Sequence, residues 1–177
     1  DSKEGLEMFD HAYEYFSAIG YQAGNVLAGI SKASAYFLAK DYQRAVKQAE
    51  STLELAEKTE SLTNIWRLEL LRGESLLKLG HQDIAEKALR HAQSIVDLLS
   101  GTMVSDKAKI RFGTGKEAIT QGLVDIDLKN EDYIKLFEDM ERGRARAFVS
   151  MLATKQVGME TNHPEIKLIK ALDADVL

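Results

Sequence analysis

An internal repeat with a period of about 40 residues is the feature of this sequence that most restricts its fold, because periods of that length are typical of stacked structural units. Two sets of residues, one period apart, follow the same spacings of 4, 3 and 4: Val26, Ile30, Ala33 and Phe37, then Trp66, Leu70, Gly73 and Leu77. Positions i, i+4, i+7 and i+11 lie on one face of an α-helix. Ala33 and Gly73 occupy the same slot, and we expect residues this small to let two helices approach closely.

The second half of the unit repeats as well. Four pairs of residues match at the same offset: Ala45 with Ala85, Thr52 with Ala92, Leu55 with Ile95, and Ala56 with Val96. Turn residues stand between the two halves, and of these Asp41 suits a helix N-cap while Gly80 suits a left-handed C-terminal cap. Each unit is therefore predicted to be a helix, a tight turn and a second helix.

The period extends in both directions from these two units. Residues 3–19 match the second helix of a unit, so we expect a leading half-unit and a chain that is a fragment of a longer polypeptide. In the other direction, the turn at 130–133 resembles the turn at 39–42, with extra residues inserted near 100–116. The sequence predicts helices over residues 3–19, 22–39, 42–59, 62–79, 82–99, 106–128, 131–154 and 164–174.

Composition supports an all-α fold. The strong helix formers Leu, Ala, Glu and Lys dominate the chain, and its single proline is Pro164. After residue 154 the sequence becomes polar, and Pro164 suits the first turn of a short helix. We therefore expect a helical repeat domain over residues 1–154, followed by a linker and a short C-terminal helix over residues 155–177.

The arrangement of small residues resembles the tetratricopeptide repeat (TPR) family, in a variant with a long period. In that family small residues recur at fixed offsets along a helical hairpin, and Gly73, Ala85 and Ala92 stand at the matching positions of the second unit. The first unit departs from the pattern at Ala49 and Thr52. Over residues 3–154, the resemblance implies a right-handed α-solenoid of antiparallel helix hairpins, with about three full hairpins after a leading half-repeat.

By that resemblance, the first helix of each hairpin lines a concave groove that binds a protein or a peptide. The groove residues that we single out are Leu27, Ile30, Ser34, Phe37, Arg67, Leu70, Glu74, Lys78 and Asp125. The same positions also include Leu38, Leu77, Ala118, Gln121, Leu128 and Lys129. This mixed lining suits a segment with apolar anchors and charges of both signs. Core packing is the alternative for the apolar members, and a solvated helix face is the alternative for the charged ones.

A second resemblance lies in the last repeat. Residues 137–152, which include the run Glu-Arg-Gly-Arg-Ala-Arg at 141–146, resemble the helix that closes the repeat array of bacterial proteins with a caspase-like CHAT peptidase domain. It leads us to expect a bacterial, cytoplasmic protein, and docking of an adjacent domain of the same polypeptide is one possible role for Arg142 and Arg146, which share a helix face. The alternatives are an ion-paired helix, with Glu138 beside Arg142, and contact with phosphate or nucleic acid.

The residues themselves argue against several classes of function. The chain has no cysteine, so it lacks the nucleophile of such a peptidase, and we expect no catalytic activity in it. A net charge of −5 argues against binding nucleic acid or an anionic membrane, and no apolar run is long enough to span a bilayer. The four histidines include no i, i+4 pair, and the glycine-rich run 113–118 lacks the surrounding strands of a dinucleotide site. We therefore expect neither a metal nor a cofactor.

The sequence thus predicts a non-catalytic scaffold fragment that binds a protein or peptide segment in its groove, with Arg67, Glu74 and Lys78 setting the register. Two alternatives stay open. One is the regulatory repeat module of a caspase-like CHAT peptidase, and the other is the sensor array of a bacterial signalling or transcriptional regulator. Chaperone tails are not expected as ligands, because the Lys and Asn of the carboxylate clamp are replaced by Ile30 and Ser34, and then by Leu70 and Glu74.

Overall fold

A computed structural model describes residues 2–102 and 116–144, and within these two ranges the chain is helical and has no strand. The helices are α1 (Ser2–Ala18), α2 (Gln22–Leu38), α3 (Tyr42–Lys58), α4 (Leu62–Leu79), α5 (Gln82–Thr102) and α7 (Lys116–Lys129). A further helix occupies residues 133–144. The all-α prediction is therefore confirmed for the described part of the chain.

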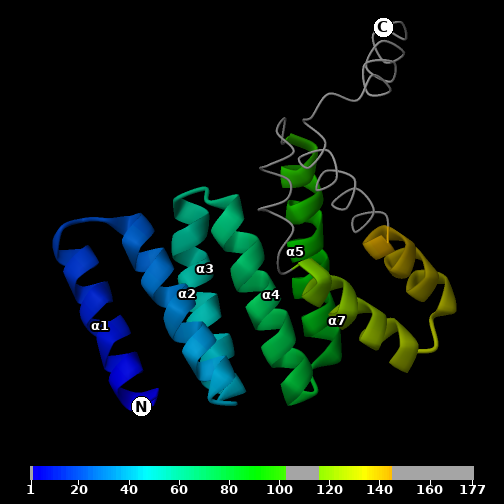
Figure 1. Ribbon diagram of the computed structural model, residues 1–177, viewed down its shortest axis with the longest axis horizontal. Coiled ribbons are helices and arrows are strands. Elements are labelled where there is room, and N and C mark those ends of the chain that lie inside the picture. Colours follow the sequence, from blue (N-terminus) through cyan, green and yellow to red (C-terminus); the bar gives the residue numbers. More distant parts are fainter. Residues whose placement is uncertain (1, 103–115, 145–177) are drawn as a thin grey trace, which may run out of the picture.

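The helices pack in the order of the sequence, as Figure 1 shows. From α1 to α5 each helix packs against the next one, and α5 then packs against α7. In addition, α2 contacts α4, and α4 contacts α7, so that the first helices of successive hairpins also touch. This is the packing of a helical repeat, in which each unit buries its apolar face against its neighbours.

Every described turn between two helices contains one residue with a left-handed backbone. These residues are Gly20, Lys40, Glu60, Gly80 and Glu131, with φ values of 69°, 60°, 51°, 83° and 57°. In each turn the amide of the following residue donates to the carbonyl five residues earlier, as in Asp41 N–H to Tyr36 O and His81 N–H to Leu76 O, both at 2.9 Å. This Schellman geometry satisfies carbonyl groups that the helix end leaves free. Because the first four left-handed residues are evenly spaced along the chain, each unit of the repeat consists of two halves with the same ending.

The predicted helix boundaries are close to the observed ones. The Asp41 side chain caps α3 by accepting a hydrogen bond from the Arg44 amide, and Gly80 ends α4 in the left-handed conformation, as expected. α5 continues to Thr102, beyond its predicted end at residue 99, and the helix predicted from residue 131 begins at residue 133. Several predictions lie outside the described residues, namely the part of helix 106–128 before Lys116, residues 145–154, and the whole segment 155–177.

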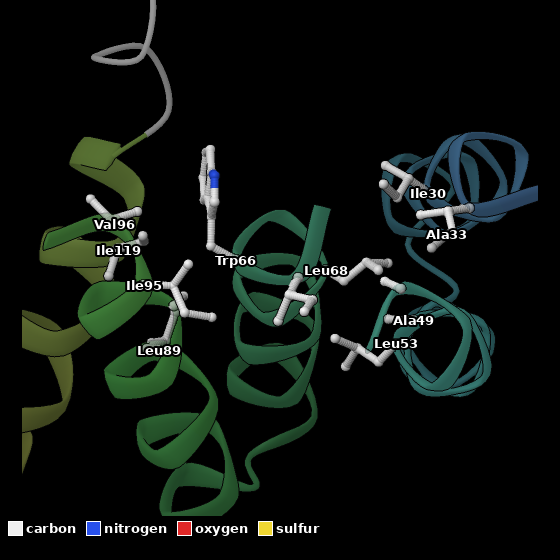
Figure 2. Close-up of a cluster of buried hydrophobic side chains, with 14 of the residues drawn as sticks. Ile30, Ala33, Ala49, Leu53, Trp66, Leu68, Leu89, Ile95, Val96 and Ile119 are labelled. Carbon is white, nitrogen blue, oxygen red and sulfur yellow. The ribbon is translucent and has the colours of Figure 1, made fainter. Parts of the chain in front are cut away.

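The hydrophobic core runs along the array between the paired helices (Figure 2). Leu89 on α5 is fully buried, and a Cβ atom added at Gly73 of α4 or at Gly122 of α7 would lie 2.8 Å from its side chain. Glycine at both positions therefore lets α4 and α7 approach the same leucine. The small slot predicted at Ala33 and Gly73 is buried in both units, which is why it must be small.

Candidate functional site

A hollow of about 490 Å³ lies between α4 and α7, which are the first helices of two successive hairpins. It is lined by Glu74, Leu77, Lys78, Gly80, Gln82, Ala118, Gln121, Gly122, Asp125, Ile126 and Lys129. Three of the groove residues that we singled out, Glu74, Lys78 and Asp125, are among them. The fold therefore brings charged positions of two different repeats into one concave site.

The other polar or exposed groove residues lie outside the lining of this hollow. Leu27 is 47 % exposed on α2, and Arg67 is exposed on the first turns of α4. Ser34 is partly buried on α2. The hollow thus contains some of the predicted groove positions on α4 and α7, and none of those on α2.

Three apolar groove positions pack helices together instead. Ile30 is only 7 % exposed and belongs to the core, which agrees with the core-packing alternative for this position. Leu70 is partly buried and packs against the same core. Phe37, also partly buried, makes an edge-to-face contact with Tyr42 across the turn, with ring centroids 5.6 Å apart. A core stripe and a groove stripe share one helical periodicity, so the spacing of these residues did not separate the two roles.

Glu74 is the ionisable group of the hollow whose pKa is shifted. Its side chain is partly buried, and burial raises the pKa of its carboxyl above the ordinary value, whereas the charge of Lys78, one turn later, lowers it. Among the residues that the structure describes, none forms a hydrogen bond or an ion pair with the Glu74 carboxylate. A partly desolvated carboxylate without a donor gains free energy from any donor that a bound molecule supplies.

Asp125 adds a second carboxylate to the hollow, from α7. Its Oδ1 accepts a hydrogen bond from Gln121 Nε2 at 2.7 Å. Lys78 and Lys129 stand in the last turns of α4 and α7, where a positive charge interacts favourably with the helix dipole. Each helix therefore presents a carboxylate and, four residues later, an ammonium group to the same hollow.

A cluster of buried charges lies where α5, α7 and the helix at 133–144 meet. Arg90 of α5 donates to Asp139 at 2.5 Å and lies 3.5 Å from Asp127 and 3.4 Å from Glu86. Asp127 and Asp139 are only 1 % and 2 % exposed. Burial, together with the neighbouring Asp139 and Glu86, raises the pKa of Asp127 to about 6, although Arg90 acts in the opposite direction. This cluster, which the sequence analysis missed, joins three helices.

Arg142 also joins two helices of the array. Its Nη1 donates to Gln93 Oε1 of α5 at 2.8 Å, and the predicted pairing with Glu138 is not formed. The pairs Arg90–Asp139 and Gln93–Arg142 have the same separation along the chain, so α5 and the helix at 133–144 keep one register over two contacts. Arg146 lies outside the described residues, and docking of a following domain stays a prediction.

The raised pKa of Asp127 predicts a specific pH dependence of stability. The folded chain holds a proton on Asp127 up to about pH 6, whereas the unfolded chain releases it near 3.8, so this group's contribution to stability falls as the pH rises through that window. The Asp127→Asn variant keeps a donor for Asp139 without the titration. Its free energy of unfolding relative to wild type should therefore rise by about 2 kcal/mol between pH 4 and pH 7.

Urea denaturation of both chains across this pH range measures the difference. Shifts that both chains share, such as those of Asp41 and Asp132, cancel in the comparison. The control is Asp125→Asn, which removes an exposed carboxylate from the same helix. Its pH profile should follow that of wild type, and a flat difference for Asp127→Asn would contradict the buried carboxyl pair.

Within residues 2–102 and 116–144, no three His, Asp or Glu side chains come together as a metal ion would need. In the same part of the chain, no helix has the length and apolar character required to cross a membrane. Compared with protein-family models, with curated proteins and with solved structures, the chain matches none of them.

Proposed function

We propose that this chain is a right-handed α-solenoid of the TPR type and that it binds a segment of a partner protein without catalysing a reaction. The internal repeat of the sequence and the packing of helices in sequence order support this proposal. So does the small slot at Ala33 and Gly73, which matches the spacing of that family. The second resemblance, to the helix that precedes a CHAT domain, leads us to propose that it is a scaffold in the bacterial cytoplasm.

The observation that carries the proposal is the hollow between α4 and α7. Its surface combines apolar side chains, among them Leu77 and Ile126, with the charged groups Glu74, Lys78 and Asp125. A concave surface with an apolar floor and a few placed polar groups is what a specific binding site needs. A peptide segment with one or two apolar anchors and charged flanks fits that description, and the charged groups would set its register.

A peptide selection tests this assignment. The full chain is used to select from a displayed library of random 12-residue peptides, and the affinity of each enriched peptide is measured by fluorescence anisotropy. Reversing the charges of Glu74 and Lys78, which line the hollow, together with that of Arg67 on the same helix should weaken binding at least tenfold, because attractions between α4 and the peptide become repulsions.

The control reverses three exposed charges on α3, Lys47, Glu54 and Lys58, which changes the net charge by the same amount. This variant should bind as wild type does. Peptides that bind the groove variant and the wild-type chain equally would rule out the groove, and a selection that enriches no sequence would rule out peptide binding.

A second candidate function is supported by one further observation. The helix at 133–144 exposes four large apolar side chains, Tyr133, Ile134, Phe137 and Met140. A patch of this kind on a helix face is typical of a surface that contacts another domain. It favours a regulatory module beside a CHAT peptidase. The gene sequence after the codon for Leu177 tests this candidate, because a downstream His and Cys dyad would support it and an early stop codon would contradict it.

A further inference from the structure

We propose that the hollow between α4 and α7 selects a positively charged side chain, Lys or Arg, in the bound segment and that Glu74 is its counter-ion. This inference rests on the proposed function, and it specifies the sign of the charge at one position of the bound segment. The hollow has two ammonium groups and two carboxylates, so its net charge does not reveal the sign of the ligand. The burial and hydrogen bonding of each charged group indicate which sign of charge the ligand carries.

The lysines of the hollow already have a structural role. Lys78 and Lys129 occupy the last turns of α4 and α7, where a cation stabilises the negative end of the helix dipole. Both side chains are exposed, so water solvates their charge without any ligand. Neither lysine gains much from an additional anion.

The carboxylates stand in the opposite situation. Glu74 and Asp125 each lie one turn before the lysine of the same helix, away from the helix end. Asp125 accepts the hydrogen bond from Gln121. Glu74 is partly buried, and in the part of the chain that the structure describes no donor reaches it. A cation that donates a hydrogen bond at this point would offset the cost of partly burying this carboxylate.

The lining of the hollow also suits the long methylene stem of a Lys or Arg side chain, and not only its charged end. Leu77 and Ile126 contribute apolar surface to it, and Gly80 and Gly122 add no side-chain bulk. Long cationic side chains cover apolar surface with their methylene groups while the charged end reaches a polar partner. Glu74 lies three residues before Leu77 on the same helix, so the stem and the charged end would meet neighbouring positions of α4.

A positional-scanning library of 10-residue peptides tests the inference. Each position is fixed in turn as Lys, Arg, Gln, Glu or Leu, and binding to the full chain is measured at pH 7. One position should favour Lys and Arg over Gln by about tenfold, since a charged hydrogen bond is gained. With Glu74→Gln this preference should disappear, whereas Lys78→Met should keep or strengthen it, because a competing cation is removed.

A pH series supplies a second readout. Burial raises the pKa of Glu74, so binding of the Lys peptide should strengthen as the pH rises and this carboxyl loses its proton. The Gln peptide should show no such change. Circular dichroism of each variant establishes that the fold is retained.

The outcomes separate this inference from the proposed function. If peptides bind and the preferred residue is Glu, with affinity lost in Lys78→Met and kept in Glu74→Gln, the groove assignment stands and the charge assignment is overturned. If peptides bind with no preference for charge, the counter-ion role of Glu74 is likewise overturned. If no peptide in the library binds, both the inference and the peptide-binding function fail.

Discussion

Replacing Arg90 by methionine should lower the free energy of unfolding by about 3 kcal/mol at pH 7. Arg90 is the cation between Asp127 and Asp139, two carboxylates that are buried on different helices. Without the guanidinium group these carboxylates either stay charged and unpaired or take up protons, and both outcomes cost free energy. Methionine retains much of the apolar stem, so the change mainly removes the charge.

Urea denaturation followed by circular dichroism measures the loss at pH 7 and at pH 5. The loss should be smaller at pH 5, because protonation of the buried carboxyl pair relieves its repulsion. Arg144→Met is the control. Arg144 pairs with Glu141 at 2.9 Å, but its side chain is 71 % exposed, so this change should cost less than about 0.5 kcal/mol. Equal losses for the two variants would show that the Arg90 cluster does not stabilise the array.

Replacing Leu89 by alanine should destabilise the chain by about 3 kcal/mol, which lies within the range for a fully buried leucine. Its side chain fills the space beside Gly73 and Gly122, and neither glycine has a side chain that could move into the cavity. The loss therefore includes the cost of an unfilled cavity as well as the lost burial. The contacts of α5 with α4 and α7 both weaken, so the effect reaches two repeats.

The matched control for Leu89→Ala is Leu98→Ala on the same helix. Leu98 is 56 % exposed, so its truncation should change the free energy of unfolding by about 0.5 kcal/mol or less. The change in intrinsic helix propensity is the same in both variants, so urea denaturation compares their burial directly. A similar cost at the two positions would contradict the position of Leu89 at the centre of the core.

The turns show how far local sequence predicts the fold. Asp41 and Gly80 are residues with a known preference for helix ends, and both take the roles predicted for them. Lys40 and Glu60 adopt the same left-handed backbone as Gly80, although neither residue type favours it. A left-handed residue other than glycine costs about 1–2 kcal/mol, and here the backbone hydrogen bonds that close the turn offset it. The sequence predicted both turns, but the residue types gave no sign of the left-handed backbone at Lys40 and Glu60.

The candidate site shows where the sequence was insufficient. Glu74, Lys78 and Asp125 were selected by their repeat positions, and the fold places all three in one hollow. Ile30 was selected by the same rule, yet it lies in the core. The lining residues Gly80, Gln82, Gly122 and Ile126 were not selected, because they belong to a turn, a second helix, or the inner side of α7. Membership of a groove depends on the neighbouring repeat as well as on the residue's own helix.

Taken alone, the sequence determined the length, order and ends of most described helices and the pairing of neighbours in hairpins. These features depend on apolar periodicity and capping within a single helix and its flanking turns, which are local properties of the chain. Only the tertiary structure decided which apolar stripe forms the core. It also brought Arg90 to Asp127 and Asp139, and among the described residues it left the Glu74 carboxylate without a hydrogen-bond donor. Burial and charge pairing depend on how closely helices from different repeats approach one another, and no local pattern specifies that distance.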